Sequence, residues 1–108
     1  MGHKSKQVTT EFLQRFADAW TEHDIDLLMS FMSVDPVFQL SSGPDMDGTR
    51  YTGFKNVKQG FQAMLDKFPD GKWVEASHFV VGDRGVSEWT FTTKGSDGIE
   101  NKVRGCDI

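Results

Sequence analysis

Cysteine and proline are scarce in this sequence of 108 residues, which has one cysteine and three prolines. Because Cys106 has no partner within the chain, it cannot form an internal disulfide, and this fits a reducing compartment. No apolar run approaches the roughly 20 residues that span a bilayer, and residues 1–7 lack the apolar core of a secretory signal. These absences predict a cytoplasmic protein with no membrane contact.

Clustered positive charge is also absent. The net charge is −4, the isoelectric point is near 5.2, and the 12 lysines and arginines are scattered along the chain. Because nucleic-acid surfaces depend on clustered Lys and Arg, the sequence predicts no nucleic-acid partner. The apolar and charged fractions are typical of a globular protein, and the length fits one domain over residues 1–108.

Sequence motifs for covalent, metal or phosphate chemistry are missing. There is no glycine-rich phosphate loop, no zinc-ligand spacing and no nucleophile elbow. His23 beside Asp24 and Asp26 could suggest metal ligands, but Asp24 is better explained as a helix N-cap. Residues 45–48 resemble the start of a calcium loop, although Asn56 stands where that loop needs a glutamate. We therefore expect no metal and no cofactor.

Hydrophobic periodicity predicts three helices and four strands. Apolar residues recur every three or four positions in the helices and every second position in the strands. The helices are expected over residues 7–20, 24–32 and 54–67. The strands are expected over residues 37–41, over two arms of a hairpin from 72 to 93 with its turn at 82–85, and over 100–108. This order predicts an α+β fold with the helices on one side of a bent antiparallel sheet.

Aromatic residues are unusually frequent, with nine Phe, three Trp and one Tyr. They could simply fill a core, or they could line a pocket for a small apolar ligand. Trp20 and Trp89 are the better candidates for a pocket wall because a tryptophan and its N–H are awkward in a fully packed interior. Tyr51 is expected on the rim of a loop. The candidate ligand-binding residues are Phe16, Trp20, Phe38, Tyr51, Phe61, Trp89 and Phe91.

Asp107 is the candidate for acid–base chemistry, provided that it faces the aromatic side of the sheet. A symmetric four-residue turn that pairs Lys94 with Ile99 would place it on the face of Glu88. An odd-numbered turn or a bulge would place it beside Trp89. The sequence leaves both arrangements open.

His78 is the only histidine in a predicted strand, and it could assist Asp107 because imidazole titrates near neutrality. A histidine in such a place is more commonly a structural residue with its hydrogen bonds satisfied. Catalysis by an Asp107–His78 pair and a structural role for His78 are therefore both carried forward.

Several segments together resemble the SnoaL-like branch of the nuclear transport factor 2 superfamily. They are WTEHDIDLLMSFM, PVFQL, the Gly53-Phe54 helix entry, HFVVGDRGVSEWTF and the final GCDI. The resemblance implies a cone-like α+β fold, in which three N-terminal helices and a strongly curved, mainly antiparallel sheet enclose an apolar cavity. It also implies homodimers formed through the sheet. Members of this branch continue past the aspartate with further strands, so the chain resembles one truncated at its C-terminus.

The family includes polyketide cyclases, ketosteroid isomerases and hydrolases. Asp107 matches the strand context of the aspartate that ketosteroid isomerases use. Phe16 stands where they have a tyrosine, and Leu40 lies near the place of their basic aspartate, which disfavours steroid isomerisation. We therefore expect a binding protein for a small apolar or aromatic ligand, with cofactor-independent cyclase, isomerase or hydrolase chemistry at Asp107. The alternative is a non-catalytic binding or dimeric assembly module.

Overall fold

The computed structural model describes residues 8–46, 48–94 and 98–108, which form an α+β structure of two compact units. The first unit comprises Met1–Glu22 and Asp70–Ile108, and the second comprises His23–Pro69. In both units, helices pack against antiparallel strands, as the sequence predicts.

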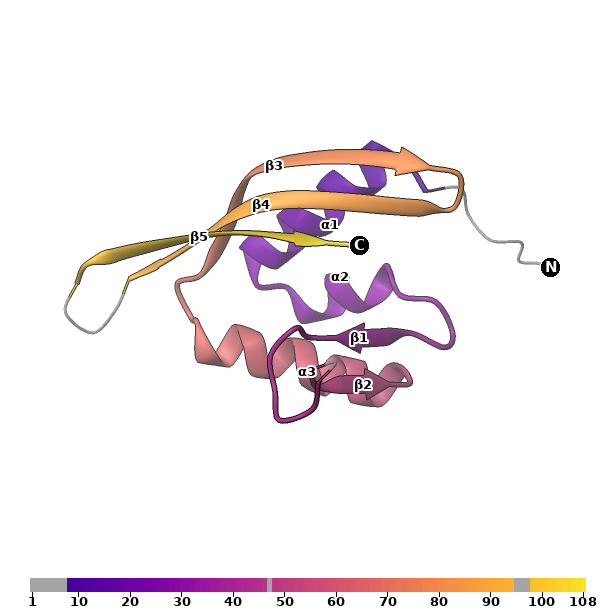
Figure 1. Cartoon of the computed structure of the whole chain (residues 1–108), viewed down its shortest axis with the longest axis horizontal. Coiled ribbons are helices and arrows are strands. Elements are labelled where there is room, and N and C mark those ends of the chain that lie inside the picture. Colours follow the sequence, from indigo (N-terminus) through magenta and orange to yellow (C-terminus); the bar gives the residue numbers. More distant parts are fainter. Residues whose placement is uncertain (1–7, 47, 95–97) are drawn as a thin grey trace. The chain divides into compact units, whose positions relative to one another are not determined.

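Helix α1 (Thr10–Glu22) packs along strands β3 and β4 of the first unit (Figure 1). It begins three residues later than predicted, because the hydroxyl of Thr9 accepts a hydrogen bond from the Phe12 amide at 3.0 Å and acts as the N-cap. Ala17 and Trp20, at 7% and 8% exposure, are buried on its inner side. Leu13 and Phe16 complete a stripe at helical spacing, so α1 presents one continuous apolar face.

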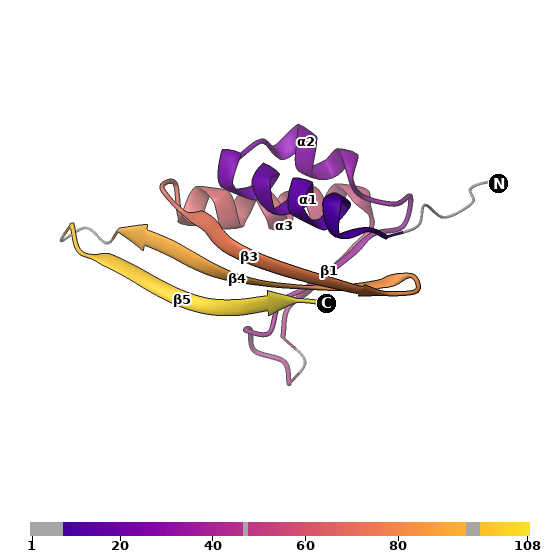
Figure 2. The ribbon, with the colours of Figure 1, turned by 90° about the horizontal axis from the view of Figure 1, so that it is seen from above.

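The sheet of the first unit has three antiparallel strands in the order β3-β4-β5 (Figure 2). These are β3 (Lys72–Val81), β4 (Arg84–Lys94) and β5 (Glu100–Asp107). The β3–β4 turn is shorter than predicted, because Val81 pairs with Arg84 and leaves two residues between the strands. The first of them, Gly82, has φ 61°, a value that glycine adopts readily at this position of a hairpin turn.

A β-bulge interrupts β3. Glu75 and Ala76 together lie opposite Trp89 of β4, and the regular pairing shifts there by one residue. Glu75 has φ 55°, a left-handed conformation that is uncommon for a residue other than glycine. Sequence periodicity does not reveal this bulge. Its effect is that Trp73 and His78, an odd number of residues apart, lie on the same face of the sheet.

The second unit packs α2 (Ile25–Ser30) and α3 (Phe54–Lys67) together, with strands β1 (Val37–Gln39) and β2 (Arg50–Thr52) against α3. The predicted N-cap is confirmed, since Asp24 Oδ1 accepts from the Leu27 amide at 3.1 Å. The buried apolar residues of this unit are Leu28, Met29, Val57, Phe61 and Leu65.

The expectation that Tyr51 lies on the rim of a loop is wrong. Residues 50–52 form β2, in which Tyr51 pairs with Phe38 of β1. Tyr51 also lies directly over Gly60 of α3, where an added Cβ would come within 2.9 Å of the tyrosine ring. Glycine at position 60 therefore permits the close approach of the tyrosine ring to the helix. A three-residue strand is too short for its alternation to stand out in a sequence.

Candidate functional site

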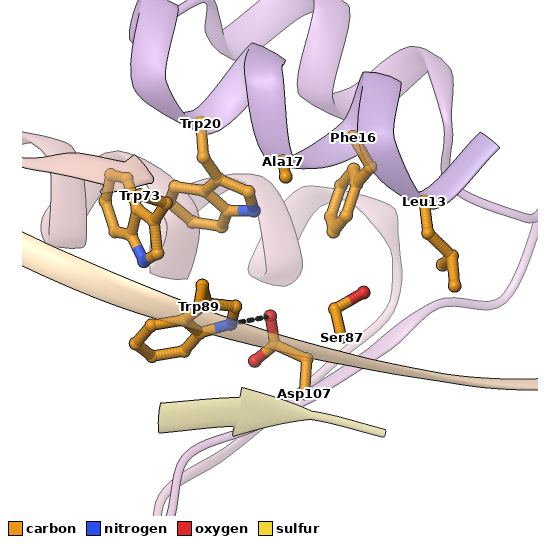
Figure 3. A pocket seen from close by; sticks show the side chains of 8 residues that line it. All are labelled: Leu13, Phe16, Ala17, Trp20, Trp73, Ser87, Trp89 and Asp107. Atoms are coloured by element: carbon orange, nitrogen blue, oxygen red, sulfur yellow. Dashed lines mark hydrogen bonds between the residues drawn. The ribbon is translucent and has the colours of Figure 1, made fainter. Parts of the chain in front are cut away.

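A small pocket lies between α1 and the sheet of the first unit (Figure 3). Helix α1 contributes the apolar stripe on one side, and strands β3, β4 and β5 contribute the other side. Eight residues line it, namely Leu13, Phe16, Ala17, Trp20, Trp73, Ser87, Trp89 and Asp107.

The register of β4 and β5 places Asp107 on the aromatic face of the sheet. Lys94 pairs with Glu100, so five residues separate the paired positions, and Asp107 lies directly opposite Ser87. This is the odd-numbered connection that the sequence left open. Because opposite residues of an antiparallel pair share a face, Asp107 stands beside Trp89, which pairs with Gly105.

Trp89 lies across β5 and reaches Asp107. Its indole covers Gly105, where an added Cβ would overlap the ring, so glycine at this position allows the indole to lie against the strand. The indole Nε1–H then donates a hydrogen bond to Asp107 Oδ2 at 3.0 Å (Figure 3). Gly105 thereby sets the position of the donor that holds the carboxyl.

The environment of Asp107 favours its protonated form. Burial of the carboxyl against the aromatic side chains raises the pKa of Asp107 above its ordinary value, and the Trp89 hydrogen bond acts in the opposite direction. The residue as a whole is exposed, because β5 is the edge strand of this sheet. This open side lets water screen the charged form and limits the increase in pKa.

A tryptophan pair forms part of the pocket wall. The ring centroids of Trp20 and Trp73 are 5.0 Å apart, and those of Trp73 and Phe91 are 4.7 Å apart. The hydroxyl of Thr21 fixes the backbone of Trp73, because it donates to the Trp73 carbonyl at 2.9 Å and accepts from the Trp73 amide at 3.0 Å. This double hydrogen bond fastens the end of α1 to the start of β3.

His78 does not line the pocket but contacts a residue that does. Its Nδ1 lies 2.8 Å from Ser87 Oγ, and its Nε2 lies 2.8 Å from Gln14 Oε1. Ser87 is 8% exposed and stands directly across from Asp107. The structure thus connects His78 to the site through Ser87.

The predicted aromatic residues fall into two clusters, one in each unit. Phe16, Trp20 and Trp89 line the pocket, and Phe91 packs against Trp73 behind it. The other three predicted residues, Phe38, Tyr51 and Phe61, form a cluster of the second unit. Their ring centroids are 5.8 Å apart for the Phe38–Tyr51 pair and 4.7 Å apart for the Phe38–Phe61 pair.

Sequence reasoning missed four residues of the pocket, namely Leu13, Ala17, Trp73 and Ser87. Leu13 and Ala17 could have been found from their helical spacing with Phe16 and Trp20. Ser87 could have been found, because it precedes Trp89 by two positions and so shares its face of the strand. Trp73 could not, because its face depends on the bulge at Glu75.

The pocket is small, with a cavity volume of about 10 Å³. That space is near the lower limit for a single water molecule. An aromatic ligand would therefore have to displace the side chains that close the pocket.

Neither a metal site nor a membrane-spanning helix is found in the described parts of the chain. Across residues 8–46, 48–94 and 98–108, no three His, Cys, Asp or Glu side chains gather in a way that could hold a metal ion. No helix among these residues has the length and apolar character needed to cross a membrane.

Similar solved structures show the same fold. A proposed polyketide cyclase from Acidithiobacillus ferrooxidans is 22% identical, with a TM-score of 0.74 over 98% of this chain and 79% of the other. A protein of unknown function from Mesorhizobium loti, described as similar to nuclear transport factor 2, is 29% identical, with a TM-score of 0.69 over 90% and 75%. TerC, crystallised with polyporic acid, is 17% identical, with a TM-score of 0.70 over 90% and 76%.

Sequence comparison assigns the family. No curated protein matches the chain, but the model of the SnoaL-like domain matches residues 13–108, which include every residue that lines the pocket. The resemblance inferred from the sequence is therefore confirmed, and the chain belongs to the SnoaL-like family.

Proposed function

We propose that the first unit binds a small aromatic, oxygenated molecule in the pocket between α1 and the sheet, and that Asp107 performs acid–base chemistry on its carbonyl group. The observation that carries this proposal is the hydrogen bond from Trp89 to Asp107 at the edge of an apolar pocket. The relatives support it, since TerC was crystallised with polyporic acid and the Acidithiobacillus protein is a proposed polyketide cyclase.

Trp89 assigns different tasks to the two oxygens of Asp107. An indole N–H can only donate, so Oδ2, which receives it, is an acceptor. The proton of the neutral carboxyl then resides on Oδ1. As an acid, Oδ1–H would donate to a carbonyl oxygen; as a carboxylate, Oδ1 would remove a proton from the carbon next to that carbonyl. Such chemistry needs no cofactor.

The Asp107 proton can be tested with acetophenone, an aromatic ketone that only accepts hydrogen bonds. We expect its affinity, measured by NMR titration, to rise as the pH falls and Asp107 takes up its proton. In Asp107→Asn the amide NH₂ donates at every pH, while its oxygen still accepts from Trp89. The variant should therefore bind acetophenone without that pH dependence. An unchanged pH dependence in Asp107→Asn would remove Asp107 from the proposal.

A larger ligand can be tested with polyporic acid. If it enters the pocket, it should raise the melting temperature, because a ligand that binds the native state stabilises that state. Ala17→Trp should abolish the shift, since it fills the space beneath α1. Lys67→Trp, on the last turn of α3 in the second unit, is the matched control. An equal shift in Ala17→Trp would place the compound elsewhere.

The outer face of the sheet supports a second candidate function, which is assembly into a homodimer through the sheet. Phe79 and Val81 of β3 are 55% and 75% exposed, and they share the face opposite Ser87 and Asp107. Exposed apolar residues on one sheet face favour a protein partner. Phe79→Glu should convert a dimer into a monomer in sedimentation equilibrium, and a wild-type monomer at high concentration would exclude this candidate.

A further inference from the structure

A chain of hydrogen bonds runs from the exposed side of α1 to the pocket. Gln14 Nε2 donates to Asp18 Oδ1 at 2.9 Å on the helix surface. Gln14 Oε1 lies 2.8 Å from His78 Nε2, and His78 Nδ1 lies 2.8 Å from Ser87 Oγ. Of these four residues, Ser87 alone lines the pocket, where its side chain lies close to the Asp107 carboxyl (Figure 3).

The carboxylate at the outer end fixes the direction of every hydrogen bond in this chain. Because a carboxylate accepts, the amide nitrogen of Gln14 faces Asp18 and its amide oxygen faces His78. An amide oxygen also accepts, so the proton of the neutral imidazole resides on Nε2. His78 Nδ1 is then an acceptor, and it receives the one hydroxyl proton of Ser87.

We propose that Ser87 contacts the ligand as a hydrogen-bond acceptor, so that a molecule that donates a hydrogen bond to it binds more tightly than one that cannot. Asp18, Gln14 and His78 are positioning residues that hold the hydroxyl proton of Ser87 away from the pocket. This inference rests on the proposed function, and it narrows the ligand class to aromatic molecules that carry a hydroxyl group.

Because Ser87 stands opposite Asp107, the ligand must also match the distance between these two side chains. Directly opposite residues of an antiparallel pair have Cβ atoms about 4.5–5.5 Å apart. Their polar atoms can therefore meet two substituents of one aromatic ring. The pocket would take a ring with a hydroxyl group facing Ser87 and an oxygen facing Asp107.

The donor requirement can be measured with phenol and anisole, which differ in whether the oxygen carries a proton. We expect the wild-type protein to bind phenol about fivefold more tightly than anisole in NMR titrations, as one ordinary hydrogen bond would give. Ser87→Ala should lose this preference. Because Ser87→Ala also changes the space in the pocket, a second variant is needed.

Gln14→Leu breaks the chain without changing the pocket. With the acceptor for Nε2–H removed, His78 can shift its proton to Nδ1, and Ser87 can turn its own proton towards the ligand. The preference for phenol should fall by at least half. Gln62→Leu is a matched control, because Gln62 Nε2 donates to Asp66 at 2.9 Å in the same arrangement on α3 of the second unit. It should keep the full preference.

The tautomer of His78 gives a readout that does not depend on binding. Long-range ¹H–¹⁵N spectra of the imidazole, assigned with His78→Gln, should show the Nε2–H form in the wild-type protein and in Gln62→Leu. Gln14→Leu should show a mixture. A wild-type Nδ1–H form would overturn the inference, as would an equal phenol preference in all variants. If neither phenol nor anisole binds, both this inference and the proposed function fail. If the two compounds bind equally, only the role of Ser87 fails.

Discussion

The two aromatic clusters of this protein share one feature and differ in what surrounds it. In each cluster an aromatic ring lies on a glycine, Tyr51 on Gly60 in the second unit and Trp89 on Gly105 in the first. In the second unit the neighbours are buried apolar side chains. In the first unit the ring ends in a hydrogen bond to Asp107 beside a pocket. The same contact thus serves packing in one unit and positions a polar group in the other.

Removing one ring from each cluster should separate these roles most clearly. Phe61 is 3% exposed, so Phe61→Ala should cost about 3–5 kcal/mol in the free energy of unfolding. Trp89 is half-buried, and Trp89→Ala should cost less although more atoms are removed. Urea unfolding of both variants measures the difference. A larger cost for Trp89→Ala would show that its cluster is the tighter core.

The first unit depends more on polar contacts, and Thr21→Val tests this. Valine keeps the shape of threonine but leaves both backbone groups of Trp73 without the hydroxyl that they bind. We expect a loss of about 1–3 kcal/mol, because partly buried polar groups would lose their partner. Thr21→Ser retains the hydroxyl and should recover most of the stability. A loss in Thr21→Ser as large as that in Thr21→Val would contradict this expectation, because serine keeps the hydroxyl and removes only the methyl group.

Alanine substitutions at Gly60 in the helix and Gly105 in the strand should differ in their cost to the free energy of unfolding. Gly105→Ala should cost about 1–3 kcal/mol, because the indole of Trp89 must move. Gly60→Ala should cost about 1 kcal/mol less, since alanine favours a helix interior. The Trp89 Nε1–H resonance should shift in Gly105→Ala alone. An unshifted resonance would mean that Gly105 does not position the indole.

The smallest effects are expected at two carboxylates with opposite pKa shifts. Hydrogen bonds from the Thr93 hydroxyl at 2.6 Å and the Lys94 amide at 2.8 Å lower the pKa of Asp70 below its ordinary value. Its contribution to stability is therefore present above the unfolded-state pKa and is lost as the pH falls through the folded-state pKa. Asp70→Asn should be less stable than wild type at neutral pH and lose less stability on acidification.

The pKa of Asp107 is shifted in the opposite direction to that of Asp70. Its pKa is raised, so the folded state binds more protons, and stability falls as the pH rises from the unfolded-state pKa through the folded-state pKa. Asp107→Asn should match or slightly exceed wild-type stability at neutral pH, by about a few tenths of a kcal/mol, because the exposed edge screens the charge. The free energies of unfolding of Asp70→Asn and Asp107→Asn, measured from acid to neutral pH, check the direction of both pH dependences. Destabilisation of Asp107→Asn at neutral pH would contradict the raised pKa.

Local signals in the sequence predicted the elements that are long or capped by a side chain. The apolar stripe of α1 and the Asp24 cap of α2 both depend on residues within one or two helical turns. Strand β2 has three residues, too few for a period to show. The face of Trp73 depends on a bulge, which arises from pairing between strands and not from the pattern of β3 alone.

The candidate site was predicted in part for the same reason. Residue type identified Asp107 and the two favoured tryptophans, Trp20 and Trp89, as candidates, and all three line the pocket. The face of Asp107 depends on the length of the β4–β5 connection, which strand alternation alone left open. Strand alternation places Ser87 on the face of Trp89, but a serine in a strand carries no signal that marks it as a functional residue. The separation of Phe38, Tyr51 and Phe61 into their own cluster is a property of three-dimensional packing that hydrophobic spacing does not encode.

The bulge at Glu75 divides β3 into two parts whose side chains alternate in opposite phase between the two faces of the sheet. Residues before it follow one alternation and residues after it follow the other. If the register of Trp73 continued without the bulge, His78 would pair with Val86 and lie on the outer face, away from Ser87, although no residue of the pocket had been altered. Glu75→Gly would keep the bulge and relieve the left-handed backbone conformation, which should increase the free energy of unfolding by about 1 kcal/mol. The one extra residue in this strand therefore determines which side chains of β3 face the site.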